Sequence, residues 1–335
     1  MIKNSVKPDL FILILLFASA VLPMSCGKQK GNDIEIKRLD RVLEQYKDMD
    51  STSRAALRDS LDLELTALMR ILEVDTAATD EALMLWSESM PVTMFTPAAE
   101  SVFPVTDSLS HAVTTALSVA SREGLDLPQY KYAAVVWGRE KSIIVYDSVM
   151  FIALNHYLGQ DHEAYDHWPE YMRAVKRPDM LPYDVIESEL ALKYPYTAKD
   201  GDETVLSHLL YDGAMSYIKM QLMEDANECN ALGFTAEQLE DIRKNESFMW
   251  QRLAAGKMLY STDSDILSKL LDPAPRSSLI SADAPGRAVR YTGYRIVCQY
   301  MDRYPDTRLV DLLSPQFYNS RQTLQKAGYA PGKNK

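Results

Sequence analysis

Residues 143–168 form the stretch that most constrains the fold of this chain, because they predict a strand that runs directly into a helix. The segment 143–146, I-I-V-Y, has the β-branched and aromatic residues typical of a strand. Asp147 stands where a helix N-cap is expected, apolar residues follow at helical spacing, and Gly159 ends the predicted helix. A strand joined to a capped helix is a rigid unit, so we expect the rest of the chain to pack against it.

The rest of the chain is predicted to be mainly helical. Three prolines interrupt residues 75–106, so we expect irregular structure there. Residues 130–136 are a second predicted strand, which could form a hairpin with 143–146. T-A-E-Q at 235–238 is a capping box. These elements predict the α+β class, predominantly helical with a small β-sheet. Apolar spacing, N-caps and first-turn prolines predict helices at 36–46, 52–72, 107–124, 182–192, 204–225, 235–242, 263–271, 287–304 and 307–313.

The N-terminus has the features of a bacterial lipoprotein signal. Lys3 and Lys7 precede the apolar run 10–22, which is too short for a comfortable membrane span. Cys26 follows a small residue just past this run and is therefore the predicted lipidation site, although Pro23 departs from the usual lipobox. The alternative is an ordinary signal peptide that is cut nearby, with Cys26 incidental.

Four segments are expected along the chain. Residues 1–25 form the signal peptide, and residues 26–33 form a short polar tether that carries the lipid. Residues 34–106 form an N-terminal segment that is partly helical and partly irregular. Residues 107–330 form the main domain.

Charge and cysteine content exclude some classes of partner and scaffold. The net charge is −11 at pH 7, which argues against nucleic acid or an anionic lipid surface as the main partner. Beyond Cys26 only Cys229 and Cys298 remain, so no disulfide framework is expected. A single disulfide could join these two, but the apolar helical surroundings of Cys298 favour a small buried core residue.

Several motifs, in a fixed order, resemble the gliding motility lipoprotein family GldB of Bacteroidota. They include H-Y-L-G-Q-D-H-E-A-Y at 156–165, L-L-Y-D-G-A-M-S-Y at 209–217, K-M-L-Y-S-T-D-S-D at 257–265 and P-G-R-A-V-R-Y-T-G-Y-R-I-V-C-Q-Y at 285–300. The order and spacing of these motifs carry the resemblance, which covers most of the chain after about residue 100.

This resemblance implies a cell-envelope lipoprotein that is linked to gliding motility or to type IX secretion. Its partners would be the membrane, through the lipid at Cys26, and other envelope proteins or peptides. No acidic run follows Cys26 that would resemble the surface-export signal of these bacteria. We therefore expect an anchor that faces the periplasm, in the outer membrane.

The family is in turn distantly similar to gluzincin zinc peptidases, which implies a degenerate metallopeptidase-like core. Those enzymes carry H-E-x-x-H on one helix, with a third carboxylate ligand on a later helix. If Glu187 occupies the Glu position, Ile186 and Leu190 stand where the histidines should be, and neither has a lone pair. Asp212 replaces the later glutamate. We therefore expect no catalytic residue, no metal and no cofactor; the alternative is an active metal-dependent peptidase with an atypical ligand set.

Charged residues on the predicted helices suggest a binding cleft. His208 and Asp212 are one turn apart, so both could face the same cleft. Arg287 and Arg290 could pair across it with a carboxylate, or they could simply lie on the surface of a half-buried helix. The carboxylates available are Glu187, Glu189 and Asp212. The candidate cleft and binding residues are Asp147, His156, Glu187, His208, Asp212, Arg287 and Arg290.

Two further features are informative. His156, His162 and His167 have a spacing that does not match a helical ligand pair, which favours a hydrogen-bonded turn over a metal site. Gly293 lies inside the helix predicted at 287–304, where glycine costs about 1 kcal/mol relative to alanine. We therefore expect another helix to approach closely at Gly293.

Overall fold

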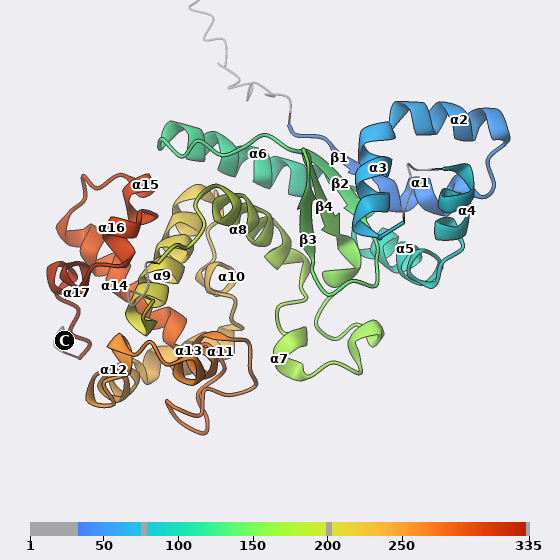
Figure 1. Cartoon of the computed structure of the whole chain (residues 1–335). Helices are drawn as coiled ribbons and strands as arrows, with labels where there is room; N and C mark the ends of the chain where they lie inside the picture. The colour runs from blue at the N-terminus through green and yellow to red at the C-terminus, as the bar shows by residue number, and fades with distance from the viewer. Residues whose placement is uncertain (1–32, 75–78, 199–202, 333–335) are drawn as a thin grey trace, which may run out of the picture. The chain divides into compact units, whose positions relative to one another are not determined.

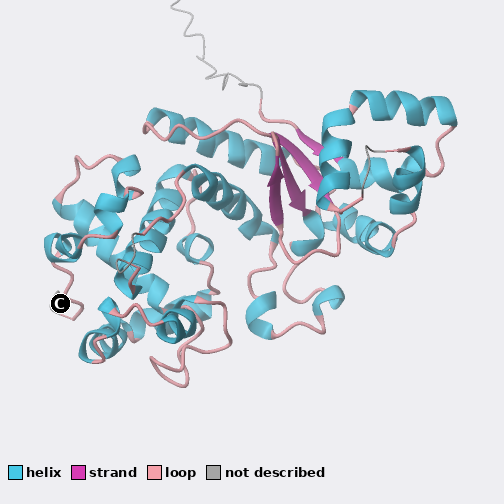
Figure 2. Cartoon of the chain, viewed as in Figure 1, coloured by secondary structure: helices cyan, strands magenta, loops and turns pink. Residues whose placement is uncertain are grey.

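A four-stranded mixed sheet lies between two sets of helices in the computed structural model (Figures 1 and 2). The structure describes residues 33–74, 79–198 and 203–332. The predicted signal peptide, the lipidation site Cys26 and the tether up to residue 32 lie outside the described residues. Asp33–Lys335 forms one compact unit.

The strand order of the sheet is β1-β2-β4-β3. The strands are β1 (Ile36–Arg38), β2 (Lys131–Val135), β3 (Ile143–Tyr146) and β4 (Val149–Ala153). β2 pairs in parallel with both β1 and β4, and β3 pairs antiparallel with β4. The predominantly helical α+β class is therefore confirmed.

The helix predicted to follow Asp147 is wrong, because Val149–Ala153 forms strand β4. All five of its side chains are buried, since both faces of the sheet are covered. A short apolar run of this kind cannot be distinguished from a buried helix by periodicity. Asp147, with φ +55°, belongs to the turn between β3 and β4. The predicted hairpin of 130–136 with 143–146 is also wrong, because β3 pairs with β4.

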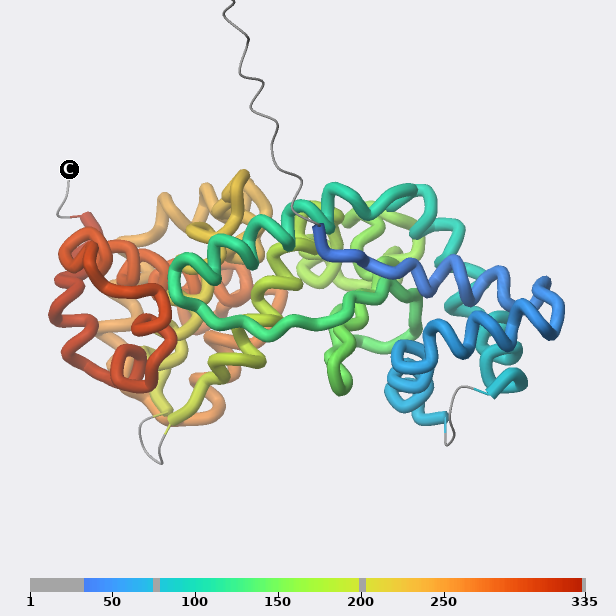
Figure 3. Tube along the Cα trace, turned by 90° about the horizontal axis from the view of Figure 1, so that it is seen from above, coloured from blue at the N-terminus to red at the C-terminus, as the bar shows by residue number. Residues whose placement is uncertain are grey.

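One face of the sheet packs on the N-terminal helices. Leu39, Leu68, Trp137 and Phe151 belong to the same core cluster, which joins these helices to β2 and β4. Figure 3 shows these helices in blue to cyan, on the side of the sheet away from the C-terminal helices. They are α1 (Leu39–Tyr46), α2 (Ser51–Ser60), α3 (Asp62–Ile71) and α4 (Asp80–Ser87). α5 (Met90–Val102) follows, and its buried Val92 and Ala99 belong to a different core cluster.

The irregular structure expected over residues 75–106 is not observed in its described part, 79–106, because α4 and α5 occupy most of it. Pro91 lies in the first turn of α5, where its missing N–H leaves no helical bond unmade. Pro97 is accommodated inside the same helix. Proline in a first turn was therefore compatible with a helix here.

The other face of the sheet packs on longer helices whose predicted starts are confirmed. α6 (Asp107–Arg122), α8 (Leu181–Lys193) and α9 (Val205–Leu222) begin within one residue of the predicted positions. Thr204 and Ser207 form a capping box at the start of α9. The remaining helices are α7 (Glu170–Arg173), α10 (Glu228–Leu232), α11 (Ala236–Lys244), α12 (Glu246–Ala255), α13 (Ser264–Leu271), α14 (Val289–Arg303), α15 (Leu309–Leu312), α16 (Pro315–Tyr318) and α17 (Arg321–Ala327).

α9 and α14 approach each other through two glycines. A Cβ atom added to Gly293 would lie 1.9 Å from the carbonyl oxygen of Leu209, and one added to Gly213 would lie 2.4 Å from the Gly293 backbone. The close helix contact predicted at Gly293 is therefore confirmed. This contact fixes the distance between two of the three helices that carry the candidate site.

Candidate functional site

A buried ionic network joins α8, α9 and α14. Oε1 of Glu187 accepts a hydrogen bond of 2.9 Å from Nη2 of Arg290, and its Oε2 accepts one from Nζ of Lys219. The side chains of Lys219 and Arg290 are only 1% and 6% exposed, whereas that of Glu187 is 34% exposed. Burial opposes ionisation of Glu187, but Arg290 and Lys219 outweigh it and hold the pKa of this carboxyl well below its usual range.

A second carboxylate on α8 extends the network. Asp184 accepts a hydrogen bond of 2.8 Å from the hydroxyl of Tyr157. Burial, and then the nearby charge of Glu187, raise the pKa of Asp184 to about 6 against the opposing charges of Lys219 and Lys176. This carboxyl therefore titrates closer to neutrality than an ordinary aspartate.

His156 lies at the end of this network nearest the sheet. It is buried, its Nδ1 is 3.0 Å from Oγ of Ser142 and 3.4 Å from Nζ of Lys176, and its ring meets Trp168 edge to face. Burial, and then the charge of Lys176, lower the pKa of His156 to about 3. Burial also lowers the pKa of Lys176 to about 8. His156 is therefore neutral at pH 7, while most of Lys176 remains charged.

One of the two arginines expected to pair with a carboxylate does so in the structure. Arg290 pairs with Glu187, as considered from the sequence. Glu189 instead faces the sheet, where it is fully buried and accepts a 2.6 Å hydrogen bond from Tyr132. Asp212 lies close enough to Arg290 to attract its charge. Three of the predicted residues (Glu187, Asp212 and Arg290) therefore belong to one cluster.

Two other predicted residues lie elsewhere. Asp147 is exposed in the β3–β4 turn, at the opposite end of that hairpin from His156. His208 stacks on Tyr196, with ring centroids 4.2 Å apart, and its Nε2 is 3.1 Å from Oε1 of Glu203. His208 precedes the lysine of the network by about three turns of α9, a rise of roughly 16 Å. The structure thus separates His208 and Asp147 from the ionic network.

Arg287 lies beside the network, and the charges of Asp212, Glu187 and Asp272 attract it from beyond ion-pair distance. Its backbone has φ +61°, a conformation uncommon for a residue other than glycine. Its Nε is buried without a hydrogen-bond partner, and no ion pair between described residues includes it. Burial, and then the charge of Arg290, lower the pKa of Arg287. Arg287 is also one of the residues that line a pocket.

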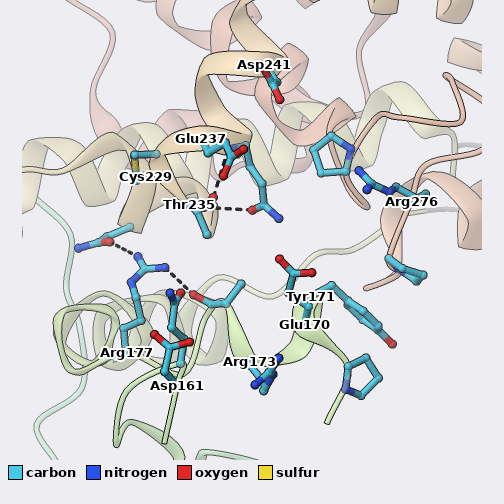
Figure 4. Close-up of a pocket in the computed structure, with 18 of the residues that line it drawn as sticks. Asp161, Glu170, Tyr171, Arg173, Arg177, Cys229, Thr235, Glu237, Asp241 and Arg276 are labelled. Carbon is cyan, nitrogen blue, oxygen red and sulfur yellow. Dashed lines mark hydrogen bonds between the residues drawn. The ribbon is translucent and has the colours of Figure 1, made fainter. Parts of the chain in front are cut away.

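Two neighbouring pockets lie beside the network, and both include Tyr171, Ala174 and Gln238 in their walls. The first, which we call the polar pocket, has a volume of about 820 Å³. Figure 4 shows Glu170, Arg173 and Arg177 across this pocket from Thr235 and Glu237. Arg177 is fixed there by a 2.8 Å hydrogen bond to the side chain of Asn230.

The second, which we call the aromatic pocket, has a volume of about 770 Å³. Trp168, Tyr171 and Phe234 supply aromatic rings, and Lys176 and Arg287 supply positive charge. Leu232, whose carbonyl lies 3.4 Å from Nη1 of Arg290, also contributes to this wall. The aromatic pocket therefore lies directly beside the ionic network.

Sequence reasoning missed three important members of this region: Asp184, Lys176 and Lys219. A signal was present for Lys219, which lies between Ile218 and Leu222 on a mostly apolar helix. A lysine in such a position must find a partner, because an unpaired buried charge is very costly. Asp184 carries no comparable signal, because an acidic residue is common in the first turn of a helix. Lys176 lies outside any helix, next to Arg177, where no periodic pattern singles it out.

The described residues also limit other kinds of site. Among them, no three His, Cys, Asp or Glu side chains gather in a way that could hold a metal ion. Cys229 and Cys298 are both free. Within the same residues, no helix combines the length and apolarity needed to cross a membrane.

Fold and site together define an α+β protein in which a buried ionic network adjoins two pockets. Comparison with known families adds the family itself. The protein-family model described as gliding motility protein GldB matches residues 27–331, so the chain belongs to the GldB family. No curated protein matched the chain. No solved structure matched it either.

Proposed function

We propose that this protein is a cell-envelope lipoprotein linked to gliding motility or type IX secretion, where it binds another envelope protein or a peptide without catalysis. The observation that carries the proposal is the GldB family match over residues 27–331. In this proposal the lipid at Cys26 anchors the chain in the outer membrane, and the folded part faces the periplasm.

The state of Glu187 supports binding rather than catalysis. Both of its carboxylate oxygens accept hydrogen bonds from cations, and these cations depress its pKa. A carboxylate in this state is a poor general base, because an effective base has a pKa near the working pH. Ile186 and Leu190, at the histidine positions of the zinc-peptidase motif, are fully buried core residues. On this proposal, the remote resemblance to zinc peptidases reflects a scaffold that is used for binding.

Deletion of the gene in its host tests the link to motility and secretion. We expect slower spreading on a surface, or reduced export of secreted proteins, and full rescue by the wild-type gene. A deletion strain that spreads and exports normally would contradict this part of the proposal.

Metal analysis and a peptide-cleavage assay on the full-length protein in detergent test the absence of catalysis. We expect zinc far below one atom per chain and no cleavage. Stoichiometric zinc together with peptide cleavage, both lost in His208→Ala or Asp212→Ala, would instead establish the metal-dependent peptidase with an atypical ligand set.

The anchor has its own test. Cys26→Ala should abolish incorporation of labelled fatty acid and move the protein out of the membrane fraction, because acyl chains provide stable attachment. Cys229→Ala is the matched control, since that cysteine lies within the folded part. Labelling that persists in Cys26→Ala would refute lipidation at this residue.

A further inference from the structure

The aromatic pocket combines apolar walls with two cations, Lys176 and Arg287, that form no ion pair among the described residues. We propose that this pocket binds an organic carboxylate that carries an apolar group, such as the C-terminal residue of a peptide. The inference deepens the proposed function and rests on its binding role.

Two cations in this region form ion pairs with a carboxylate, and two others form none among the described residues. This difference points to an anionic ligand. Lys219 and Arg290 share Glu187, so their charges are met within the chain. Among the described residues, Lys176 lies within hydrogen-bond distance of Ser142 and His156 and forms no ion pair, although the charge of Asp184 attracts it from farther away. Arg287 has no ion pair among the described residues, and its buried Nε has no partner. Cations in such positions lower the stability of the empty protein unless an anion completes them.

The pocket walls carry an excess of positive charge in a protein that is acidic as a whole. Lys141, Lys176 and Arg287 contribute three cations, whereas Glu140 is the only acidic residue in the lining. The whole chain has a net charge of −11. A local reversal of sign inside a pocket favours an anionic ligand over a neutral or cationic one.

The backbone of Arg287 adopts a conformation that is unfavourable in free energy. Its φ of +61° is unfavourable for a residue with a Cβ atom. The preceding Gly286 lies so close to Ala274 that an added Cβ atom would be 1.9 Å from the carbonyl oxygen of Ala274. The strained turn therefore fixes the position of Arg287 in the pocket lining, and strain of this kind is concentrated at functional sites.

The rest of the lining suits an apolar group. Trp168, Met172, Phe234 and Pro273 provide most of the apolar wall, and Nζ of Lys176 lies 5.2 Å from the centre of the Trp168 ring. The volume of about 770 Å³ lies within the usual range for small-molecule sites, roughly 300–1,000 Å³. A carboxylate near the cations, with its apolar group on the rings, would use both kinds of wall. Inorganic phosphate would use only the charges.

Isothermal titration of the full-length protein in detergent tests the proposal with a matched pair of probes. The first probe is N-acetyl-Leu-Phe with a free carboxylate, and the second is the same peptide with a C-terminal amide. We expect the acid to bind at least ten-fold more tightly than the amide. Equal binding of both probes, no saturable binding of the acid, or equally tight binding of inorganic phosphate would overturn the proposal.

Variants of the two cations locate the carboxylate. Arg287→Gln and Lys176→Met should each weaken binding of the acid at least ten-fold without weakening binding of the amide, and Arg287→Lys should restore part of the affinity. Arg276→Gln is the control, because Arg276 lines the polar pocket but not the aromatic pocket. Unchanged binding in both cation variants, with their thermal unfolding intact, would contradict the site.

Two further readouts separate the possible outcomes. 3-Phenylpropionate, a free organic acid, should bind as tightly as the peptide acid if the natural ligand is a small acid, and more weakly if it is a peptide terminus. Mass spectrometry of the recovered peptide should find it intact. Cleavage would defeat the non-catalytic function while leaving the carboxylate site standing, whereas loss of the preference for the acid, with the deletion phenotype intact, would defeat the site alone.

Discussion

The hydroxyl of Tyr132 on β2 donates a 2.6 Å hydrogen bond to Oε1 of Glu189 on α8. Both side chains are buried, and Oε2 of Glu189 has no hydrogen-bond partner. Burial raises the pKa of Glu189 from 4.5 to about 7, although the Tyr132 hydrogen bond opposes this shift. α8, one of the three helices that carry the ionic network, is thus joined to the sheet through a carboxyl whose neutral form is favoured by burial.

The raised pKa predicts how stability changes with pH. Because the folded state holds the proton of Glu189 up to about pH 7, this contribution to stability is full below about pH 4.5 and is lost as the pH rises through 7. Glu189→Gln removes this loss while keeping an oxygen that can accept the Tyr132 hydrogen bond. We expect the variant to exceed the wild type by roughly 3 kcal/mol at pH 8 and to match it near pH 4. Urea unfolding at both pH values measures this, and a constant difference between the two proteins would contradict it.

The contact between α9 and α14 predicts a large effect from one methyl group. Gly293→Ala places a Cβ atom against the carbonyl of Leu209, so the two helices must move apart. We expect a loss of about 3 kcal/mol in the free energy of unfolding, near the upper end for overpacked sites. Gly138→Ala is the control, since the nearest atom to its added Cβ is 3.7 Å away. Equal stability of the two variants, measured by thermal unfolding, would show that α9 and α14 are not tightly packed.

The central ion pair predicts a contrast between buried and exposed charges. Glu187→Gln leaves Lys219 and Arg290 buried without their carboxylate, and we expect a loss of about 3 kcal/mol. Glu240→Gln removes the exposed partner of Lys244 and should cost less than about 0.5 kcal/mol. Denaturant unfolding at pH 7 compares them, and similar values for both variants would contradict the buried network.

The turn between β3 and β4 predicts opposite effects of two substitutions at one position. Asp147 has φ +55°, which glycine adopts freely and a β-branched residue strongly resists. Asp147→Gly should leave stability within about 0.5 kcal/mol of the wild type, whereas Asp147→Val should lower it by about 1–2 kcal/mol. Thermal unfolding measures both. An Asp147→Val variant as stable as the wild type would contradict the left-handed backbone at this position.

Several helix starts were predictable, because their signals are local. Others were wrong: the helix expected from Ile36 begins at Leu39 after strand β1, and the helix expected over 52–72 is divided into α2 and α3. The Thr235 capping box, Pro182 in a first turn and the run that begins at Thr204 each determine a helix start through neighbouring residues. Hydrogen bonds within about four residues do not depend on the rest of the fold. Gly293 also allowed a correct prediction. Glycine is unfavourable inside a helix, so its presence indicated that another helix approaches closely at this point.

The sequence by itself determined the residue types, several helix starts and the family, but only the tertiary structure decided which partners meet. Val149–Ala153 reads equally well as helix or strand, and pairing with Lys131–Val135 made it the central strand β4. Arg290 had three candidate carboxylates, and the packing of α14 on α8 and α9 selected Glu187, 103 residues away. Local signals cannot specify such contacts, because they depend on how distant segments pack.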